Sequence, residues 1–183
     1  SRCSSLNIYE MHIGYFRCDD NGNFKNYREI AKDVCEYVKN MGYTHIELMP
    51  VMEHTLDESL GYQTTAYYAP TARYGTPQDF MYFVDYMHSN GIGVILDMVM
   101  AYFPDNDFGL TYFDGKPLYE YPDPKMSSYP SLNVKIFNYA LAPVRNYLIS
   151  SAYFWIDRYH ADGIRINSVS SMLYLDYNKG PGE

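Results

Sequence analysis

Segments with strand-like and helix-like patterns alternate along this chain, and this alternation limits the fold more than any other feature of the sequence. Apolar residues recur at three- and four-residue steps in three segments, which predicts amphipathic helices at 27–41, 77–90 and 143–159. Short runs rich in β-branched and apolar residues predict strands at 6–13, 44–49, 92–96 and 163–167. The order β-α-β-α-β-loop-α-β predicts parallel strands that are joined by crossover helices.

Local signals mark where several of these elements begin and end. Thr76 is a favourable N-cap and Pro77 suits the first helical position, so the pair predicts the start of the second helix. Gly42 predicts the end of the first helix, because glycine readily takes the left-handed conformation found there. The run Ile92–Leu96 is continuously apolar, as expected for a strand buried on both faces, and it ends at Asp97.

Two α/β architectures fit this order, a doubly wound open sheet and a (β/α) barrel. A doubly wound sheet usually carries a glycine-rich turn after its first strand, and residues 12–16 contain no G-x-G-x-x-G pattern. Segments 51–76 and 100–133 have no clear period and are expected to be long loops. Both follow the carboxyl ends of strands, where a barrel builds its active site, so the barrel is favoured. Four β/α units in 183 residues make about half of a (β/α)8 barrel.

Charge and composition exclude several classes of function. The formal net charge of −8 has the wrong sign for binding a phosphate backbone or an anionic membrane surface, so we expect neither nucleic acid nor membrane as a partner. The first residues lack the apolar stretch of a secretory signal, and the three cysteines form no C-x-x-C pair. These features together favour a cytoplasmic protein with reduced thiols.

The sequence gives no pattern of metal ligands. His12, His45 and His54 match no ligand spacing and are expected to be structural histidines. An acidic segment begins at Asp105, but the twelfth residue of a calcium loop would be glutamate and is here Lys116. We therefore expect no metal and no cofactor.

Several motifs closely resemble those of the bacterial glycogen branching enzymes (1,4-alpha-glucan branching enzymes), which belong to glycoside hydrolase family 13. The resemblance is carried by segments 8–12, 42–54, 61–63, 103–104 and 171–177, of which E-L-M-P-V-M-E-H and S-M-L-Y-L-D-Y are the most specific. It implies that 1–183 is a partial (β/α)8 catalytic domain containing strands one to four, with no carbohydrate-binding or C-terminal β domain. The family transfers α-1,4-glucan segments to form α-1,6 branches, which implies an α-glucan (glycogen or a maltooligosaccharide) as the partner.

The resemblance places Asn167 where the family has its nucleophile. Retaining enzymes of this kind need a carboxylate nucleophile and a carboxylic acid/base roughly 5 Å apart. The family strand reads approximately G-[FL]-R-x-D-A-V, and here Gly163–Val169 has Asn167 in place of the aspartate. An amide is neutral and far less nucleophilic than a carboxylate. The family's acid/base glutamate belongs to the fifth strand, outside these four units, so we expect the chain alone to be catalytically incompetent.

The other site residues implied by the resemblance are Asp97, Arg165, Tyr62, Gln63 and Tyr102. Arg165 lies on the same side of its strand as Asn167, and Asp97 is expected to be its only anionic partner. Tyr62 is a candidate stacking platform for a sugar ring, and Gln63 a candidate polar partner. Tyr102 occupies the position of a substrate-binding histidine in the family.

Aromatic residues expected near a glucan site are missing from this chain. The family usually has tryptophan at positions that correspond to Leu60, Met98 and a residue near Leu132, and the chain has a single tryptophan, Trp155. Because sugar rings dock on flat aromatic faces, these losses predict a weakened glucan site.

Three hypotheses remain open. The chain is part of a glucan branching enzyme, a non-catalytic α-glucan-binding pseudoenzyme, or a structural half-barrel module. In each case the first and fourth strands would be open parallel edges, which predicts self-association through them.

Overall fold

The computed structural model describes residues 5–129 and 132–174. Cys3 and the end of the last family motif, 175–177, lie outside the described residues.

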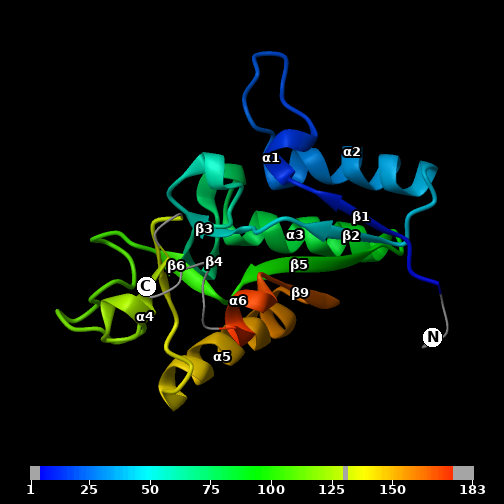
Figure 1. The fold of residues 1–183 in the computed structure, drawn as a ribbon. Coiled ribbons are helices and arrows are strands. Elements are labelled where there is room, and N and C mark those ends of the chain that lie inside the picture. Colours follow the sequence, from blue (N-terminus) through cyan, green and yellow to red (C-terminus); the bar gives the residue numbers. More distant parts are fainter. Residues whose placement is uncertain (1–4, 130–131, 175–183) are drawn as a thin grey trace.

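Four parallel strands form the central sheet of the molecule (Figure 1). These are β1 (Ile8–Met11), β2 (His45–Leu48), β5 (Gly93–Val99) and β9 (Gly163–Asn167). They pair in the order β1-β2-β5-β9, which is the order of the strands along the chain. A parallel sheet in sequence order, with a helix after each of the first three strands, confirms the predicted half of a (β/α) barrel.

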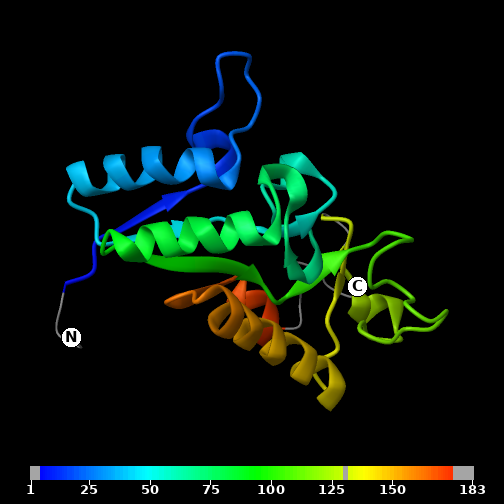
Figure 2. The ribbon, with the colours of Figure 1, turned by 180° about the vertical axis from the view of Figure 1, so that it is seen from behind.

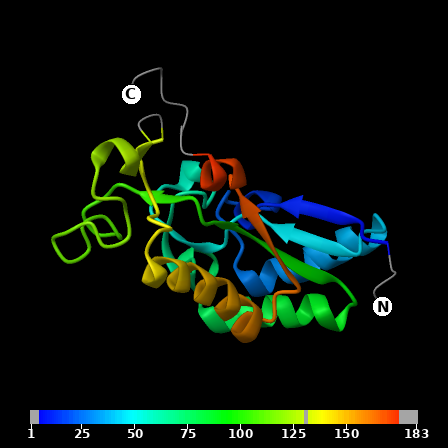
Figure 3. The ribbon, with the colours of Figure 1, turned by 60° about the horizontal axis from the view of Figure 1, so that its bottom comes forward.

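Three long helices cover one face of this sheet (Figures 2 and 3). They are α2 (Tyr27–Asn40), α3 (Pro77–Ser89) and α5 (Ala142–Tyr159), and the sequence predicted a helix at each of these places. The opposite face carries the acidic side chains of β1 and β2. The main core therefore lies between the sheet and the helices.

The predicted helix ends are confirmed in detail. Thr76 and Asp79 form a capping box at the start of α3, with the Asp79 backbone N–H donating to Thr76 Oγ1 at 3.2 Å. Pro77 occupies the first turn, where its missing N–H costs nothing. Gly42 follows the end of α2 with a φ of 77°, a left-handed conformation that favours glycine.

The segment 51–76 is more ordered than the sequence indicates. It contains the antiparallel pair β3 (Met52–His54) and β4 (Thr64–Pro70), with the 3-10 turns η1 (Asp57–Ser59) and η2 (Ala72–Tyr74). The prediction of a long loop was wrong here because β3 has only three residues, and the seven residues of β4 do not alternate strictly between buried and exposed.

The segment 100–133 also contains regular structure. Strand β6 (Tyr102–Pro104) joins β8 (Val134–Ile136) and β7 (Ser128–Tyr129) in a small antiparallel sheet, and α4 (Pro124–Ser127) precedes β7. Strands of two or three residues are too short to show a period of two, so the sequence could not reveal them. Two further short helices, α1 (Ile13–Phe16) and α6 (Val169–Leu173), follow β1 and β9 and were not predicted.

The single tryptophan anchors α5 to the rest of the fold. Trp155 is fully buried, and its indole Nε1 donates to the backbone carbonyl of Tyr67 at 2.9 Å. Ser151 Oγ, one turn earlier, donates to the same carbonyl at 2.7 Å. These two bonds fix α5 against β4, on the segment that follows the carboxyl end of β2.

None of the helices in the described part of the chain is long and apolar enough to cross a membrane.

Candidate functional site

Asp97 and Arg165 meet at the carboxyl end of the central sheet. They are register partners on β5 and β9, so their side chains project from the same face. Asp97 is fully buried, and its Oδ2 accepts a hydrogen bond from Nη1 of Arg165. The sheet register thus creates the ion pair that the sequence predicted.

Tyr62 completes this cluster from a neighbouring loop. Its hydroxyl donates to Oδ2 of Asp97 at 2.7 Å. The turn before it requires special backbone conformations, with φ of 54° at Leu60 and 88° at Gly61. A Cβ on Gly61 would lie 2.2 Å from the carbonyl oxygen of Pro50, so only glycine fits there.

Arg165 has more partners than the sequence indicated. Its Nη1 also donates to Oδ1 of Asn167 at 3.3 Å, so Asn167, which the sequence predicts at the nucleophile position, is within the cluster. Its Nε lies 3.9 Å from Oε1 of Glu47 on β2. The expectation that Asp97 is the only anionic partner of Arg165 was therefore wrong, because the register of β2 and β5 brings a third strand into range.

Burial and charge shift the pKa values of this cluster. Burial raises the pKa of Asp97, and the hydrogen bonds from Tyr62 and Arg165 act against this shift. Burial also raises the pKa of Tyr62, and its hydrogen bond to the Asp97 carboxylate adds to the effect. For Arg165, burial lowers the pKa, but the hydrogen bond and charge of Asp97 raise it above its ordinary value. The cluster therefore offers a protonated phenol and a guanidinium around one carboxylate, a set that can hydrogen-bond the hydroxyl groups of a neutral ligand.

Gln63 and Tyr102 lie at the margin of this cluster. Gln63 Nε2 donates to the carbonyl oxygen of Leu132 at 3.3 Å, which ties together the loops before β4 and β8. Tyr102 is only 8% exposed and packs in a small apolar cluster with Tyr129 and Ile136. Burial raises the pKa of Tyr102, and a hydrogen bond with Ser168 partly offsets the shift. Tyr102 thus reaches the site from within the core and has little surface for a ligand.

The structure also separates the positions where tryptophan was expected. Met98 is fully buried in the main core, because it points to the opposite side of β5 from Asp97. The interpretation that Met98 marks a lost aromatic face of the site was therefore wrong. Leu132 is 43% exposed and Leu60 is partly exposed, so these two lie in loops that a ligand can reach.

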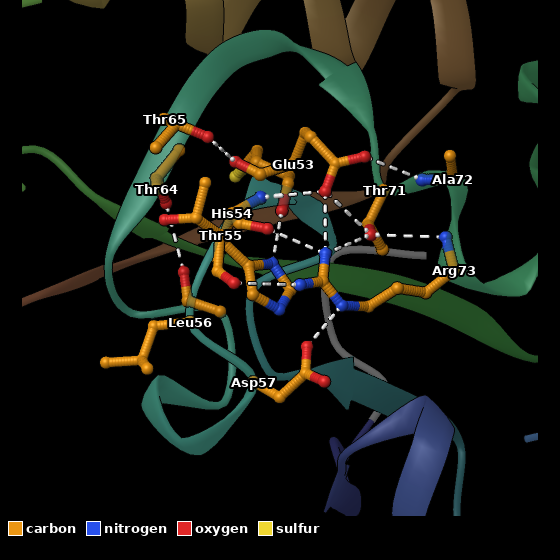
Figure 4. A network of polar contacts seen from close by, with 12 residues as sticks. Glu53, His54, Thr55, Leu56, Asp57, Thr64, Thr65, Thr71, Ala72 and Arg73 are labelled. Carbon is orange, nitrogen blue, oxygen red and sulfur yellow. Dashed lines mark hydrogen bonds and ion pairs between the residues drawn. The ribbon is translucent and has the colours of Figure 1, made fainter. Parts of the chain in front are cut away.

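A network of polar contacts supports the hairpin from which Tyr62 projects (Figure 4). The guanidinium of Arg73 donates to Glu53 Oε1 at 2.7 Å, to Asp57 Oδ1 at 2.5 Å and to the His54 carbonyl at 2.7 Å. One side chain therefore joins β3, η1 and η2. Because Tyr62 lies between these elements in the chain, the network restrains the loop that carries its hydroxyl to Asp97.

Sequence reasoning missed two carboxylates beside this cluster, Glu10 and Glu47. They are register partners on β1 and β2, and one oxygen from each of Glu10, Glu47 and Asp97 lies within 4.8 Å of the others. No motif joins them, since each belongs to a different strand. Aligning the strands side by side in the predicted order would have placed all three on one face.

Comparison with known proteins gives consistent results. Residues 20–113 match the family model of the alpha amylase catalytic domain. The chain is 53% identical over 182 residues to 1,4-alpha-glucan branching enzyme GlgB of Hydrogenovibrio crunogenus, a match that covers 100% of this chain and 25% of that protein. The GlgB of Aquifex aeolicus is 54% identical over 181 residues, covering 98% of this chain and 29% of the relative. The chain thus spans about a quarter of the length of these curated relatives.

Solved structures show the same fold. A putative α-amylase from Salmonella typhimurium aligns with a TM-score of 0.71 and 29% identity, covering 91% of this chain and 26% of that protein. An acarbose-bound α-amylase from Geobacillus thermoleovorans aligns with a TM-score of 0.69 over 90% of this chain and 40% of that protein. At 22% identity, the second match is evidence of fold alone.

Proposed function

The chain belongs to the α-amylase catalytic-domain family, and we propose that it supplies strands one to four of a (β/α)8 domain that transfers α-1,4-glucan segments to form α-1,6 branches. The observation that carries this proposal is the cluster of Tyr62, Asp97 and Arg165 at the carboxyl ends of parallel strands. Active sites of this architecture form at that end of the barrel. The similarity to proteins named as branching enzymes, which extends over the whole chain, supports the same reaction class.

Within this proposal, the residues of this chain bind and orient a glucan. The exposed part of the Arg165 guanidinium donates hydrogen bonds to sugar hydroxyls, and the buried Asp97 carboxylate holds Arg165 in place. The ring of Tyr62 supplies an aromatic face, and Gln63 a polar group at the edge of the site. A neutral ligand suits a protein with a net charge of −8 better than an anionic one does.

We propose further that the chain by itself does not catalyse the reaction. Asn167 has no charge with which to attack an anomeric carbon or stabilise an oxocarbenium-like state. The second carboxylic acid of a retaining mechanism would have to come from another segment.

The test is incubation with amylose, followed by quantification of α-1,6 linkages from their anomeric proton signals. We expect no new linkages from this chain or from its Asn167→Asp variant, because the acid/base group is still missing. New α-1,6 linkages above the level of a protein-free control would contradict the proposed inactivity.

Calorimetry with maltoheptaose tests glucan binding separately. We expect binding heat at millimolar ligand, and loss of that heat in Asp97→Asn. Asp85→Asn is the matched control, because Asp85 is exposed on α3 and outside the site. Binding without transfer would also fit the alternative of a non-catalytic glucan-binding pseudoenzyme. No heat in the unmodified chain would favour the remaining alternative, a structural half-barrel module.

Self-association is a further part of this proposal. Strands β1 and β9 end the sheet order, so each has one edge unpaired within the described sheet. Unpaired edges favour pairing with another chain, and sedimentation velocity would detect the dimers or larger species that we expect.

We also propose a cytoplasmic location, since Cys18 and Cys35 are both free thiols.

A further inference from the structure

Three carboxylates from three adjacent strands converge on the uncovered face of the sheet. Glu10 and Glu47 are register partners on β1 and β2. Glu47 pairs in turn with Ile95 of β5, and Asp97 follows two residues later on the same face. One carboxylate oxygen from each residue lies within 4.8 Å of the other two.

The protein atoms around this cluster do not satisfy it. Asp97 is fully buried, and its Oδ2 takes the hydrogen bonds from both Tyr62 and Arg165. Its other oxygen, Oδ1, is buried and has no hydrogen-bond partner among the described residues. Buried carboxylate oxygens are normally paired, so among the described residues this atom is left as a candidate donor to a bound ion.

The charges in the cluster point to the sign of that ligand. Three carboxylates face one guanidinium, and Arg165 is occupied by Oδ2 of Asp97 while its Nε lies 3.9 Å from Glu47. The cluster therefore has an excess of negative charge where like charges repel. Glu47 is partly buried, and Glu10 is exposed, which leaves an entrance from solvent.

We propose that Glu10, Glu47 and Asp97 bind a hard divalent cation of the Ca²⁺ or Mg²⁺ class. The donors are all carboxylate oxygens, which these cations prefer. Two oxygens on opposite sides of Ca²⁺, each at about 2.4 Å, are at most about 4.8 Å apart, so the spacing of the cluster suits one shared ion. The ion contacts Oδ1 of Asp97 and leaves the bond between Oδ2 and Arg165 in place, and water completes the coordination shell.

This site was not visible in the sequence. The ligands lie on three strands and are separated by helices, so they form none of the compact patterns of a calcium loop. The inference does not depend on glucan transfer, because the ion would bind this chain alone.

The experiment measures tyrosine-sensitised luminescence of Tb³⁺, with Ca²⁺ and Mg²⁺ as competitors. Tb³⁺ is a probe for hard-cation sites. The hydroxyl of Tyr62 lies 2.7 Å from Asp97 Oδ2, so the Tyr62 ring is close enough to transfer excitation energy to a bound Tb³⁺. We expect a saturable signal with one ion per chain that millimolar Ca²⁺ or Mg²⁺ displaces. Glu10→Gln and Glu47→Gln should each weaken Tb³⁺ binding at least tenfold.

Glu36→Gln is the matched control, because Glu36 is exposed on α2 and belongs to the opposite side of the sheet. Trp155 fluorescence shows whether each variant is folded, and Glu10→Gln changes an exposed side chain, so it tests the site without altering the core. The proposal is overturned if Tb³⁺ shows no saturable, competitor-sensitive signal, or if Glu10→Gln and Glu47→Gln bind like Glu36→Gln. Maltoheptaose calorimetry in the presence of a chelator measures glucan binding without a bound cation, so it tests the proposed function separately from the ion site.

Discussion

Replacing Tyr62 by phenylalanine removes one hydroxyl and leaves the aromatic ring in place. That hydroxyl donates to Asp97 Oδ2 at 2.7 Å, and Asp97 is fully buried. In the variant, Oδ2 keeps only Arg165 as a donor among the described residues. The change therefore isolates the contribution of one charge-assisted hydrogen bond to the site.

The expected cost follows from the charge and burial of the acceptor. A hydrogen bond to a charged group contributes about 1.5–3 kcal/mol to stability. Tyr62 is partly exposed, which favours the lower half of this range, so we expect a loss of about 2 kcal/mol in the free energy of unfolding. With a urea m-value of about 2 kcal/mol/M, the midpoint should fall by about 1 M.

Trp155 provides the assay. It is the single tryptophan and is fully buried, so its emission reports unfolding when it is excited selectively over tyrosine. Tyr15→Phe is the matched control, because Tyr15 is 61% exposed and its hydroxyl has no hydrogen bond within the described residues. Its midpoint should stay within about 0.5 kcal/mol of the unmodified chain.

The reasoning is refuted if Tyr62→Phe unfolds at the same urea concentration as Tyr15→Phe. A double-mutant cycle with Asp97→Asn adds a second check. The cost of removing the Tyr62 hydroxyl should shrink when Asp97 is no longer charged, whereas equal costs in both backgrounds would show that the hydroxyl acts elsewhere.

Three further predictions use the same unfolding assay. Gly61→Ala should lower the free energy of unfolding by roughly 1–3 kcal/mol and weaken maltoheptaose binding, because the added Cβ would meet the Pro50 carbonyl and displace Tyr62. The same binding heat as in the unmodified chain would contradict this. Burial lowers the pKa of His54, so the unfolded chain binds a proton more readily than the folded chain. The free energy of unfolding should therefore fall as the pH drops below about 6.5, and it should fall less steeply in His54→Asn. Hydrogen bonds from Arg28 and Thr76 lower the pKa of Asp79 to about 2. The stability that the Asp79 carboxylate contributes should be present above about pH 4 and lost as the pH falls to about 2, and Asp79→Asn should not show this loss.

The parts of the fold that could be predicted are those with long periodic patterns. Helices α2, α3 and α5 each span at least three turns, and the apolar faces of α2 and α3 repeat often enough to be recognised. The order of the parallel strands follows from the alternation of these helices with strands. In contrast, β3 has three residues and β7 has two, which is less than the length over which alternation can be recognised.

The residues of the candidate site also differ in whether they could be predicted from the sequence. Asp97 and Arg165 could be named because the resemblance implies a role for each, and their contact follows once β5 and β9 are neighbours. Glu10 and Glu47 lie in the motif segments 8–12 and 42–54, but the resemblance gave them no role, and their proximity becomes visible only when β1 and β2 are aligned in register. A shift of one residue in that register would send one carboxylate to the helix-covered face.

Alternation along β5 explains where Met98 lies. Met98 follows Asp97 directly, so the rule that directs Asp97 to the site face directs Met98 into the core between β5 and the helices. A tryptophan at position 98 would therefore pack in the core, whereas the exposed side chain of Leu132 lies in a loop beside Gln63. Of the predicted tryptophan positions, Leu60 and Leu132 in the loops are thus the ones that bear on the proposed glucan site. The strand-borne groups Asp97 and Arg165 are placed by sheet register, so the proposed contact of Arg165 with a ligand depends on the sheet rather than on the loops.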